Sequence, residues 1–156
     1  MDIRLSQIKV NLPQNKKPLF EINQFEIPQG TKVLIQGASG KGKTTLLHLI
    51  AGLFAPDNGH VYWGDTRLDT LDEESRARFR KENSAIVFQK LNLIDHLTAL
   101  ENILLALKKS GSQKDLALSA LKKVHLLDKK DVLSTYLSLG EQQRVAVSRV
   151  LAQNPK

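Results

Sequence analysis

Hydrophobic and polar residues alternate through the N-terminal part of the chain, and this pattern predicts β-strands. The apolar positions of the first segment are Ile3, Leu5, Ile8, Val10 and Leu12. Polar residues separate most of them, as in a strand with one buried face. A turn is predicted at 15–18 and a second strand at 19–27, which ends at Pro28-Gln29-Gly30.

The next segment changes from alternating to continuous apolar positions. The run Lys32-Val33-Leu34-Ile35 predicts a short strand buried in a parallel sheet. A glycine-rich loop follows it, and a helix is predicted at 44–53. Strand, glycine-rich loop and helix in this order are typical of the start of a βαβ unit.

Two further strands and several helices are predicted after this unit. The strands lie at 60–63 and 85–88, and a charged helix lies between them at 70–81, with Thr70 and Glu73 at the spacing of a capping box. After residue 91 the spacing of the apolar residues becomes typical of amphipathic helices. One helix follows the capping-box pair Thr98 and Glu101 and stops at Lys108-Lys109 and Gly111, a second carries 117–124, and a third spans 141–153.

Composition places the chain among globular proteins. It has 156 residues, of which 41% are hydrophobic and 25% are charged, and it has no cysteine. No apolar stretch approaches the roughly 20 residues needed to span a bilayer. The 23 Lys and Arg against 16 Asp and Glu give a net charge of +7. Most of these cations fall on a charged helix face, at helix ends or in turns, and aromatics make up only 5%. We therefore expect no nucleic-acid partner, whereas attraction to an anionic membrane surface is compatible with the charge.

A glycine-rich segment carries the strongest chemical pattern. The residues Gly37, Ala38, Ser39, Gly40, Lys41, Gly42, Lys43 and Thr44, followed by Thr45, match the phosphate-binding P-loop. Such a loop turns backbone N–H groups toward phosphates, and the helix N-terminus after it favours the same anion. Lys43 is predicted to reach the β- and γ-phosphates of ATP and Thr44 to ligate Mg²⁺.

Two other segments narrow the class of P-loop protein. Gln89 follows the predicted strand 85–88, where a surface amide is the simpler interpretation. The stretch 137–144 reads Leu-Ser-Leu-Gly-Glu-Gln-Gln-Arg. Ser138 and Glu141 have capping-box spacing, but a helix cap does not account for Gly140 or for the polar run after it.

Together these motifs resemble the nucleotide-binding domain of ATP-binding-cassette (ABC) transporters. The matching sequence segments are GASGKGKTTLLHLIAGL, PDNG, IVFQ, LTALENI and LSLGEQQRVAVSRVLAQNPK. They occur in the family's order over nearly the whole chain. Within the family, these segments are most similar in sequence to the lipoprotein-release and macrolide-export branch. The resemblance implies an α/β fold, with a P-loop NTPase core, an N-terminal antiparallel β subdomain and an inserted helical subdomain.

The resemblance also implies roles and partners. Gln89 would contact Mg²⁺ and the attacking water and link to the membrane partner. The signature residues Ser138, Leu139, Gly140, Glu141 and Gln142 would meet ATP held by a second ABC ATPase subunit in a head-to-tail dimer. A transmembrane permease subunit would be the other partner. The expected location is cytoplasmic, peripheral on the inner face of the cell membrane.

The chain departs from the family pattern in three ways. Leu139 stands at the first glycine of the signature, and its side chain is expected to weaken the dimer site. No aromatic for adenine stands near 10–12, and Phe20 is predicted to belong to the core. The family's buried strand ending in Asp-Glu and its switch histidine are also missing, since the sole Asp-Glu is Asp72-Glu73, after no such strand. The histidines, predicted to be packing or surface residues, are His48, His60, His96 and His125.

These departures shape the predicted organisation and activity. We expect one incomplete ABC ATPase domain, with a β and P-loop part at 1–90, a helical subdomain at 91–136 and the signature helix at 137–156. The catalytic residues are expected beyond Lys156, so that this chain alone is inactive and marginally stable. A soluble ABC ATPase acting on nucleic acid or ribosomes and a nucleotide-binding module without turnover remain alternatives.

Overall fold

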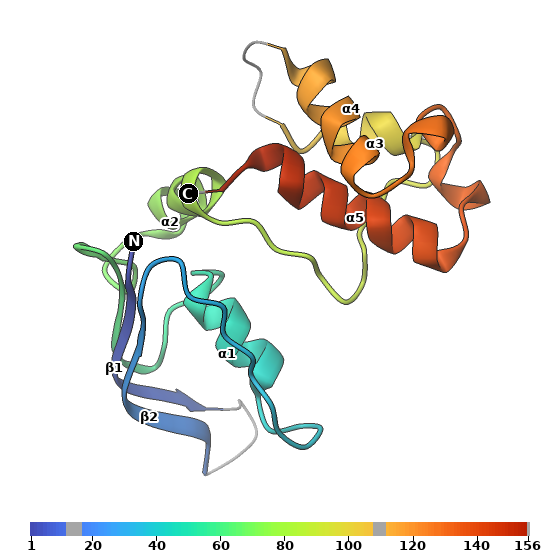
Figure 1. Cartoon of the computed structure of the whole chain (residues 1–156). Coiled ribbons are helices and arrows are strands. Elements are labelled where there is room, and N and C mark those ends of the chain that lie inside the picture. Colours follow the sequence, from blue (N-terminus) through green and yellow to red (C-terminus); the bar gives the residue numbers. More distant parts are fainter. Residues whose placement is uncertain (12–16, 108–111, 156) are drawn as a thin grey trace. The chain divides into compact units, whose positions relative to one another are not determined.

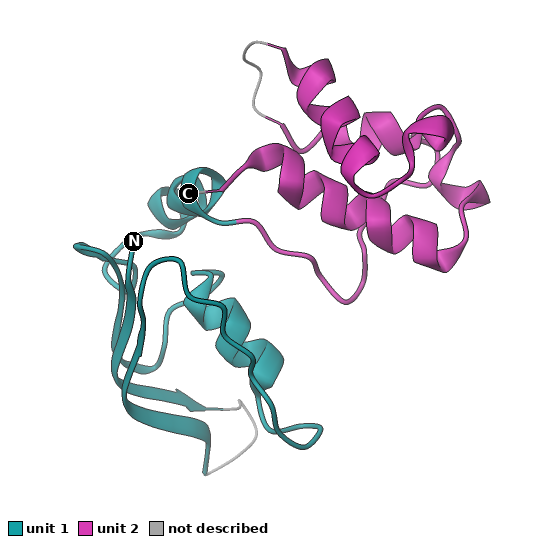
Figure 2. Ribbon diagram, in the orientation of Figure 1, with its two compact units in different colours: residues 1–84, 156 teal, residues 85–155 magenta. Residues whose placement is uncertain are grey.

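The computed structural model describes residues 1–11, 17–107 and 112–155, which form two compact units (Figures 1 and 2). The first comprises Met1–Ser84 and contains the strands, whereas the second comprises Ala85–Pro155 and is helical. The predicted turn at 15–18 lies partly outside the described residues. The helix predicted to continue from Thr98 to a stop at 108–111, which lies outside the described residues, ends earlier, at Leu104, and the described residues 105–107 form a turn.

The first unit is built on a four-stranded antiparallel sheet. Its strands are β1 (Ile3–Asn11), β2 (Pro18–Ile27), β3 (Asn58–Trp63) and β4 (Thr66–Arg67), in the spatial order β2-β1-β3-β4. β1 pairs with both β2 and β3, so Leu5 lies opposite Phe25 on one side and Val61 on the other. The strands predicted in these three regions are confirmed, and β4 is an addition that the sequence pattern does not predict.

A bulge explains the uneven spacing of apolar positions in β1. Leu5 and Ile8 are both buried, although strict alternation would put them on opposite faces. Gln7 adopts φ 50°, and the register with β3 shifts at this point. The extra residue returns Ile8 to the buried face. Opposite the bulge, Gly59 has φ +91°, and a Cβ there would lie 2.3 Å from the Gln7 carbonyl oxygen, so only glycine fits.

Two helices, α1 (Lys43–Ile50) and α2 (Glu73–Asn83), contact this sheet. The buried core of the unit consists of Leu5, Ile8, Val10, Leu49, Ile50, Val61, Trp63 and Leu68. The indole N–H of Trp63 donates to the Ile50 carbonyl at 2.8 Å. Its ring meets Phe79 edge-on, with centroids 5.8 Å apart. Trp63 therefore ties β3 to both helices.

The start of α2 differs from the prediction. The Asp72 side chain caps the helix by accepting from the Ser75 amide at 2.7 Å. The predicted capping box of Thr70 and Glu73 is wrong, because the Thr70 hydroxyl donates to the Arg67 carbonyl at 3.0 Å instead. A carboxylate placed directly before the first turn gains more from the helix N-terminus than a neutral hydroxyl does, and the cap moves accordingly.

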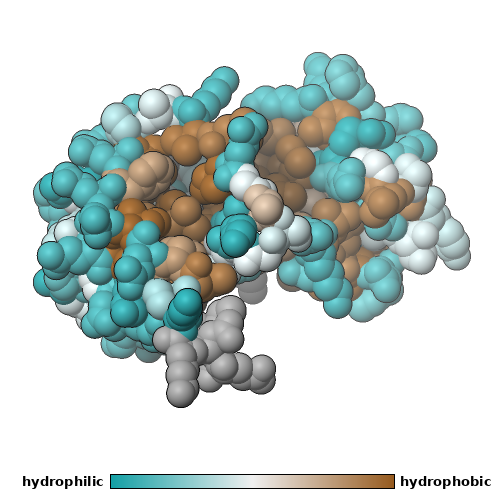
Figure 3. Space-filling view, turned by 90° about the horizontal axis from the view of Figure 1, so that it is seen from below, coloured by the Kyte–Doolittle hydropathy of each residue, from teal (hydrophilic) through white to brown (hydrophobic). Residues whose placement is uncertain are grey.

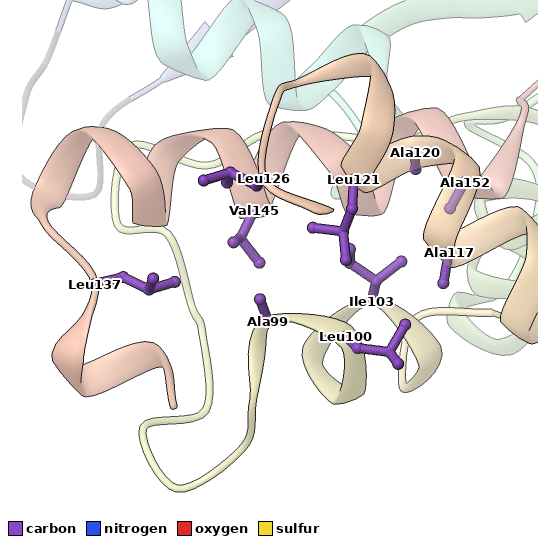
Figure 4. Packing of buried hydrophobic residues seen from close by; sticks show 10 residues of the cluster. All are labelled: Ala99, Leu100, Ile103, Ala117, Ala120, Leu121, Leu126, Leu137, Val145 and Ala152. Carbon is purple, nitrogen blue, oxygen red and sulfur yellow. The ribbon is translucent and has the colours of Figure 1, made fainter. Parts of the chain in front are cut away.

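The second unit is a group of helices around one apolar core (Figure 4). Its elements are α3 (Ala99–Leu104), α4 (Gln113–Lys123), η1 (Leu127–Lys129), η2 (Ser134–Tyr136) and α5 (Leu139–Gln153). The ten buried core residues are Ala99, Leu100, Ile103, Ala117, Ala120, Leu121, Leu126, Leu137, Val145 and Ala152. The predicted capping box of Thr98 and Glu101 is confirmed at the start of α3.

The two predicted buried strands at 32–35 and 85–88 are wrong for the described structure, where neither segment is a strand. Leu34 is 79% exposed, and Val33 and Val87 are also exposed. A strand of a parallel sheet must pair with at least one neighbouring strand, and none of the described strands pairs with either segment. Apolar side chains consequently reach the surface, as the brown areas of Figure 3 illustrate.

Candidate functional site

The predicted phosphate loop joins an irregular segment to α1 in the first unit. α1 begins at Lys43 and ends at Ile50, three residues before the predicted end. Its N-cap is Gly42, with φ +83°. A Cβ there would lie 2.8 Å from the Phe20 ring and 3.0 Å from Leu19. Glycine is therefore required twice over, by its left-handed backbone and by the apolar side chains of β2 that approach it.

The side chain of Lys43 lies inside this loop. Its ammonium donates to the carbonyl oxygens of Gly37 and Ala38, at 2.8 Å each. No side chain of the described structure caps the N-terminus of α1, and its first turn contains no acidic residue. The first amides of a helix are electropositive and lack intrahelical acceptors. A lysine and an uncapped helix N-terminus therefore face one short loop, which is a favourable arrangement for a polyanion.

Gln89 lies in the second unit, just after the segment 85–88, and is exposed. Its backbone belongs to a bend rather than to the end of a strand, since that strand is absent from the described structure. Gln89 and Thr44 belong to different units, and a shared Mg²⁺ site for the two remains a prediction. Among the described residues, no group of three or more His, Cys, Asp or Glu is arranged to hold a metal.

The signature residues divide into two groups at the start of α5. Ser138, Leu139 and Gly140 are exposed, and Leu139 is 68% exposed. Glu141 and Gln142 are half-buried. The amide of Gln142 donates to the Ser134 and Leu137 carbonyls at 3.0 and 3.2 Å, which fixes the turn before the helix.

Glu141 closes a capping box with Ser138. The Glu141 carboxylate accepts from the Ser138 amide and hydroxyl at 2.8 and 2.9 Å, while the Glu141 amide donates to the hydroxyl. It also forms an ion pair with Lys129. The Lys129 ammonium, together with the hydrogen bonds from Ser138, lowers the pKa of Glu141 to about 2. The sequence pattern places Lys129 among surface lysines and misses this contact, because lysine in a turn gives no signal of its partner.

Residues outside the motifs take part in the packing of the first unit. Phe20 packs against the core of that unit, as predicted. His60 contacts Asp69 at 3.1 Å, and the Arg67 guanidinium donates to the same carboxylate at 2.7 Å. Desolvation of the Asp69 carboxylate raises its pKa, but the hydrogen bonds from Arg67, the Val61 amide and His60 outweigh this effect. The pKa of Asp69 is lowered to about 2. This cluster joins β3 to the turn after β4.

A known protein family matches most of the chain. The sequence profile described as ABC transporter covers residues 20–156, which include the phosphate loop and the start of α5. The chain belongs to the ABC transporter family. The resemblance inferred from the motifs is confirmed.

Relatives and solved structures agree with this assignment. A lipoprotein-releasing system ATP-binding protein LolD of Treponema denticola is 40% identical over 144 residues, covering 90% of this chain and 64% of the relative. An uncharacterized ABC transporter ATP-binding protein of Methanocaldococcus jannaschii is 41% identical over 136 residues, covering 85% of this chain and 61% of the relative. The chain therefore spans a little over three fifths of the length of these two curated relatives.

A solved structure of a dimeric ATP-binding cassette bound to ADP and Pi has the same fold. It is 32% identical to this chain, with a TM-score of 0.90, and the match covers 98% of this chain and 70% of that one. The predicted α/β P-loop cassette fold of this ABC transporter chain is thereby confirmed. None of the helices in the described ranges is long and apolar enough to cross a membrane.

Proposed function

We propose that this chain is the ATP-binding subunit of an ABC transporter and couples ATP binding and hydrolysis to substrate movement across a membrane. The observation that carries the proposal is the Lys43 ammonium inside the loop at the uncapped N-terminus of α1. The similarity to LolD proteins favours export of a lipoprotein, a lipid or a drug as the transport reaction.

The phosphates of ATP replace the present acceptors of Lys43. In the described structure the ammonium is held by the carbonyls of Gly37 and Ala38. The β- and γ-phosphate oxygens are stronger acceptors for a cation, so Lys43 exchanges two neutral carbonyl acceptors for negatively charged ones. The proposed ATP-binding set is Gly37, Ala38, Ser39, Gly40, Lys41, Gly42, Lys43, Thr44 and Thr45.

Thr44 and Gln89 are the proposed protein ligands of Mg²⁺. Thr44 is exposed at the first turn of α1, next to Lys43. Mg²⁺ is usually held by few protein oxygens together with substrate phosphates and water, and a hydroxyl and a side-chain amide oxygen are donors of this kind. When bound, the ion neutralises charge on the β- and γ-phosphates.

A second ABC ATPase subunit is the proposed partner at the start of α5. Ser138 and Gly140 are exposed there and would face the γ-phosphate held by that subunit. Glu141 and Gln142 stabilise the turn that precedes α5. The side chain of Leu139 would reduce the space between this turn and the nucleotide of the partner subunit. We further propose a transmembrane permease subunit as the membrane partner and a cytoplasmic location at the inner membrane face.

Hydrolysis is assigned to the assembled transporter. The sequence contains no buried strand ending in Asp-Glu, and we propose that residues 1–156 are one incomplete ABC domain with parts at 1–90, 91–136 and 137–156. A module that binds nucleotide without turnover is the second candidate, favoured by the same missing motif. The purified chain should show ATPase activity at background level, and turnover abolished by Lys43→Ala would contradict both statements.

Binding of a fluorescent ATP analogue tests the nucleotide site. Lys43→Ala removes the charged contact to the phosphates, worth about 1.5 to 3 kcal/mol in total, so affinity should fall roughly 10- to 150-fold. Lys32→Ala is the matched control, because Lys32 is an exposed lysine just before the loop. Equal affinities for the two variants would contradict the proposed function.

A further inference from the structure

The segment after Gln89 is held in a fixed shape although it has no regular secondary structure. Residues 91–94 are neither helix nor strand. Asn92 adopts φ 51°, a left-handed conformation that is uncommon outside glycine, although asparagine adopts it more readily than most residues. Hydrogen bonds from two helices enforce the shape of the segment.

Arg149 of α5 supplies part of this enforcement. Its guanidinium donates to the Asn92 carbonyl at 2.8 Å and, through the second nitrogen, to the Leu91 carbonyl. Burial lowers the pKa of Arg149, and none of the ion pairs in the described residues includes it. The two consecutive carbonyls, presented by the turn at Asn92, are thus the acceptors that its planar fork matches.

A second anchor holds the other end of the segment. The buried side chain of Asn102 in α3 accepts from the Ile94 amide at 2.8 Å and donates to the Ile94 carbonyl at 3.1 Å. It also donates to the Ser134 hydroxyl at 2.7 Å. The segment is therefore attached to α3 at Ile94 and to α5 at Leu91 and Asn92, and Gln89 lies two residues before the first attached carbonyl.

α5 connects this attachment to the signature residues. Ser138 caps its N-terminus, and Arg149 follows eleven residues later in the same continuous helix. At 1.5 Å per residue the two positions are about 16 Å apart along a rigid rod. Buried side chains along the rod, among them Val145 and Ser148, keep it packed in the second unit.

We propose that Arg149 is a positioning residue that fixes the loop after Gln89 on α5, so that displacement at Ser138 is transmitted to Gln89. The inference rests on the proposed function in taking Ser138 and Gln89 as the residues that face nucleotide. The attachment itself, formed by Arg149 and the two carbonyls, is independent of that function.

Site-directed labelling tests the attachment. The chain has no cysteine, so Lys90→Cys gives a single site for a spin label beside Gln89. Arg149→Ala should raise the mobility of this label severalfold, and Arg149→Lys should restore it in part, since lysine reaches one carbonyl but lacks the fork. Arg149→Gln, which retains an amide donor, is measured in parallel and decides the question if Arg149→Ala fails to fold.

Two controls separate positioning from general loosening. A label at Lys122→Cys on α4 reports the packing of the same unit away from the loop, and it should not respond to Arg149→Ala. Arg78→Ala, which removes an exposed arginine of α2, should leave both labels unchanged. Unchanged mobility at position 90 in Arg149→Ala, or an equal rise at both labels, overturns the proposal.

A nucleotide titration tests the transmission. Addition of Mg²⁺ and an ATP analogue should change the position-90 signal of the parent chain. In Arg149→Ala the amplitude of that change should fall severalfold, while the affinity stays within about twofold because the P-loop is untouched. Binding without any signal change in the parent overturns the transmission. Absence of nucleotide binding in the parent contradicts the proposed function instead, and the mobility measurement still decides the attachment.

Discussion

The two helices that carry the candidate ATP-binding and signature residues of this ABC transporter chain begin in opposite ways. α1 starts from Gly42 in a left-handed conformation, with no side-chain cap and no acidic residue in its first turn. α5 starts from Ser138 in a complete capping box with Glu141. The N-terminus of α1 therefore leaves its electropositive amides for an external anion, whereas that of α5 is already satisfied by a carboxylate of the same chain.

The difference in capping predicts that the two helix N-termini would bind a phosphate with different strength. A phosphate at α1 meets a helix N-terminus that has no side-chain cap, together with the Lys43 ammonium, whose present acceptors are only the neutral carbonyls of Gly37 and Ala38. At α5 the Ser138 hydroxyl and amide already contact Glu141, and an incoming phosphate must share or displace that carboxylate. We therefore expect strong nucleotide binding at α1 and a weaker, partner-dependent contact at α5.

The largest effect is expected at the glycine that begins α1. Gly42→Ala forces a left-handed alanine against Phe20 and Leu19, which should destabilise the fold by about 3 kcal/mol and abolish binding of the ATP analogue. Urea unfolding and the binding titration measure both effects. A stable variant that binds normally would show that the described loop conformation is not the one that holds nucleotide.

Removal of the cap of α5 should have a smaller effect on stability. Ser138→Ala leaves the Glu141 amide without its side-chain acceptor and should cost about 1 kcal/mol. Thr98→Ala removes the equivalent capping box of α3 and serves as the control, with a similar loss expected. Only Ser138→Ala should also weaken nucleotide-dependent dimerisation, measured by sedimentation. An equal effect of both variants on dimerisation would contradict a role for Ser138 toward the partner.

The glycine of α5 should respond in the opposite direction to Gly42. Gly140 does not have a left-handed backbone, and a Cβ there would meet only the Arg144 side chain, at 3.9 Å. Gly140→Ala should therefore stabilise the chain by up to about 1 kcal/mol while weakening dimerisation, because the space is lost to the partner. Unchanged dimerisation would mean that this glycine is not needed for close approach.

The smallest effect concerns pH. The pKa of Glu141 is lowered from 4.5 to about 2 in the folded chain, so its contribution to stability is present above pH 4.5 and is lost as the pH falls toward 2. Urea unfolding between these pH values should therefore show a decline that is reduced in Glu141→Gln. Asp69 has a similarly lowered pKa and adds to the decline in both proteins, so only the difference between them reports Glu141.

Much of the local structure could be predicted from the sequence. The alternation of hydrophobic and polar residues predicted the strands of the antiparallel sheet. The capping boxes at Thr98 and Ser138 are local patterns, because each joins two residues three positions apart. The residues of the phosphate loop are contiguous, so its candidate ligands could be named without a fold. The bulge at Gln7 could not, because it depends on the close approach of β3 at Gly59.

The buried strands expected at 32–35 and 85–88 show where local pattern fails. A run of apolar residues indicates only that burial of the segment is favourable. A strand forms only where neighbouring strands also supply hydrogen-bond partners. The described sheet supplies none to either segment. The same limit applies to Arg149, since nothing in its local sequence indicates that it holds the carbonyls of Leu91 and Asn92, more than fifty residues away.

The sequence by itself determined the family, the phosphate loop and the positions of most helices and strands, because these depend on residue order and on short-range period. The tertiary structure alone decided that Lys129 pairs with Glu141 beside the signature residues, while Ser138, Leu139 and Gly140 remain exposed. It alone also decided that α5 holds the loop after Gln89. Both outcomes depend on contacts between distant segments, whose energies arise only when the chain has folded.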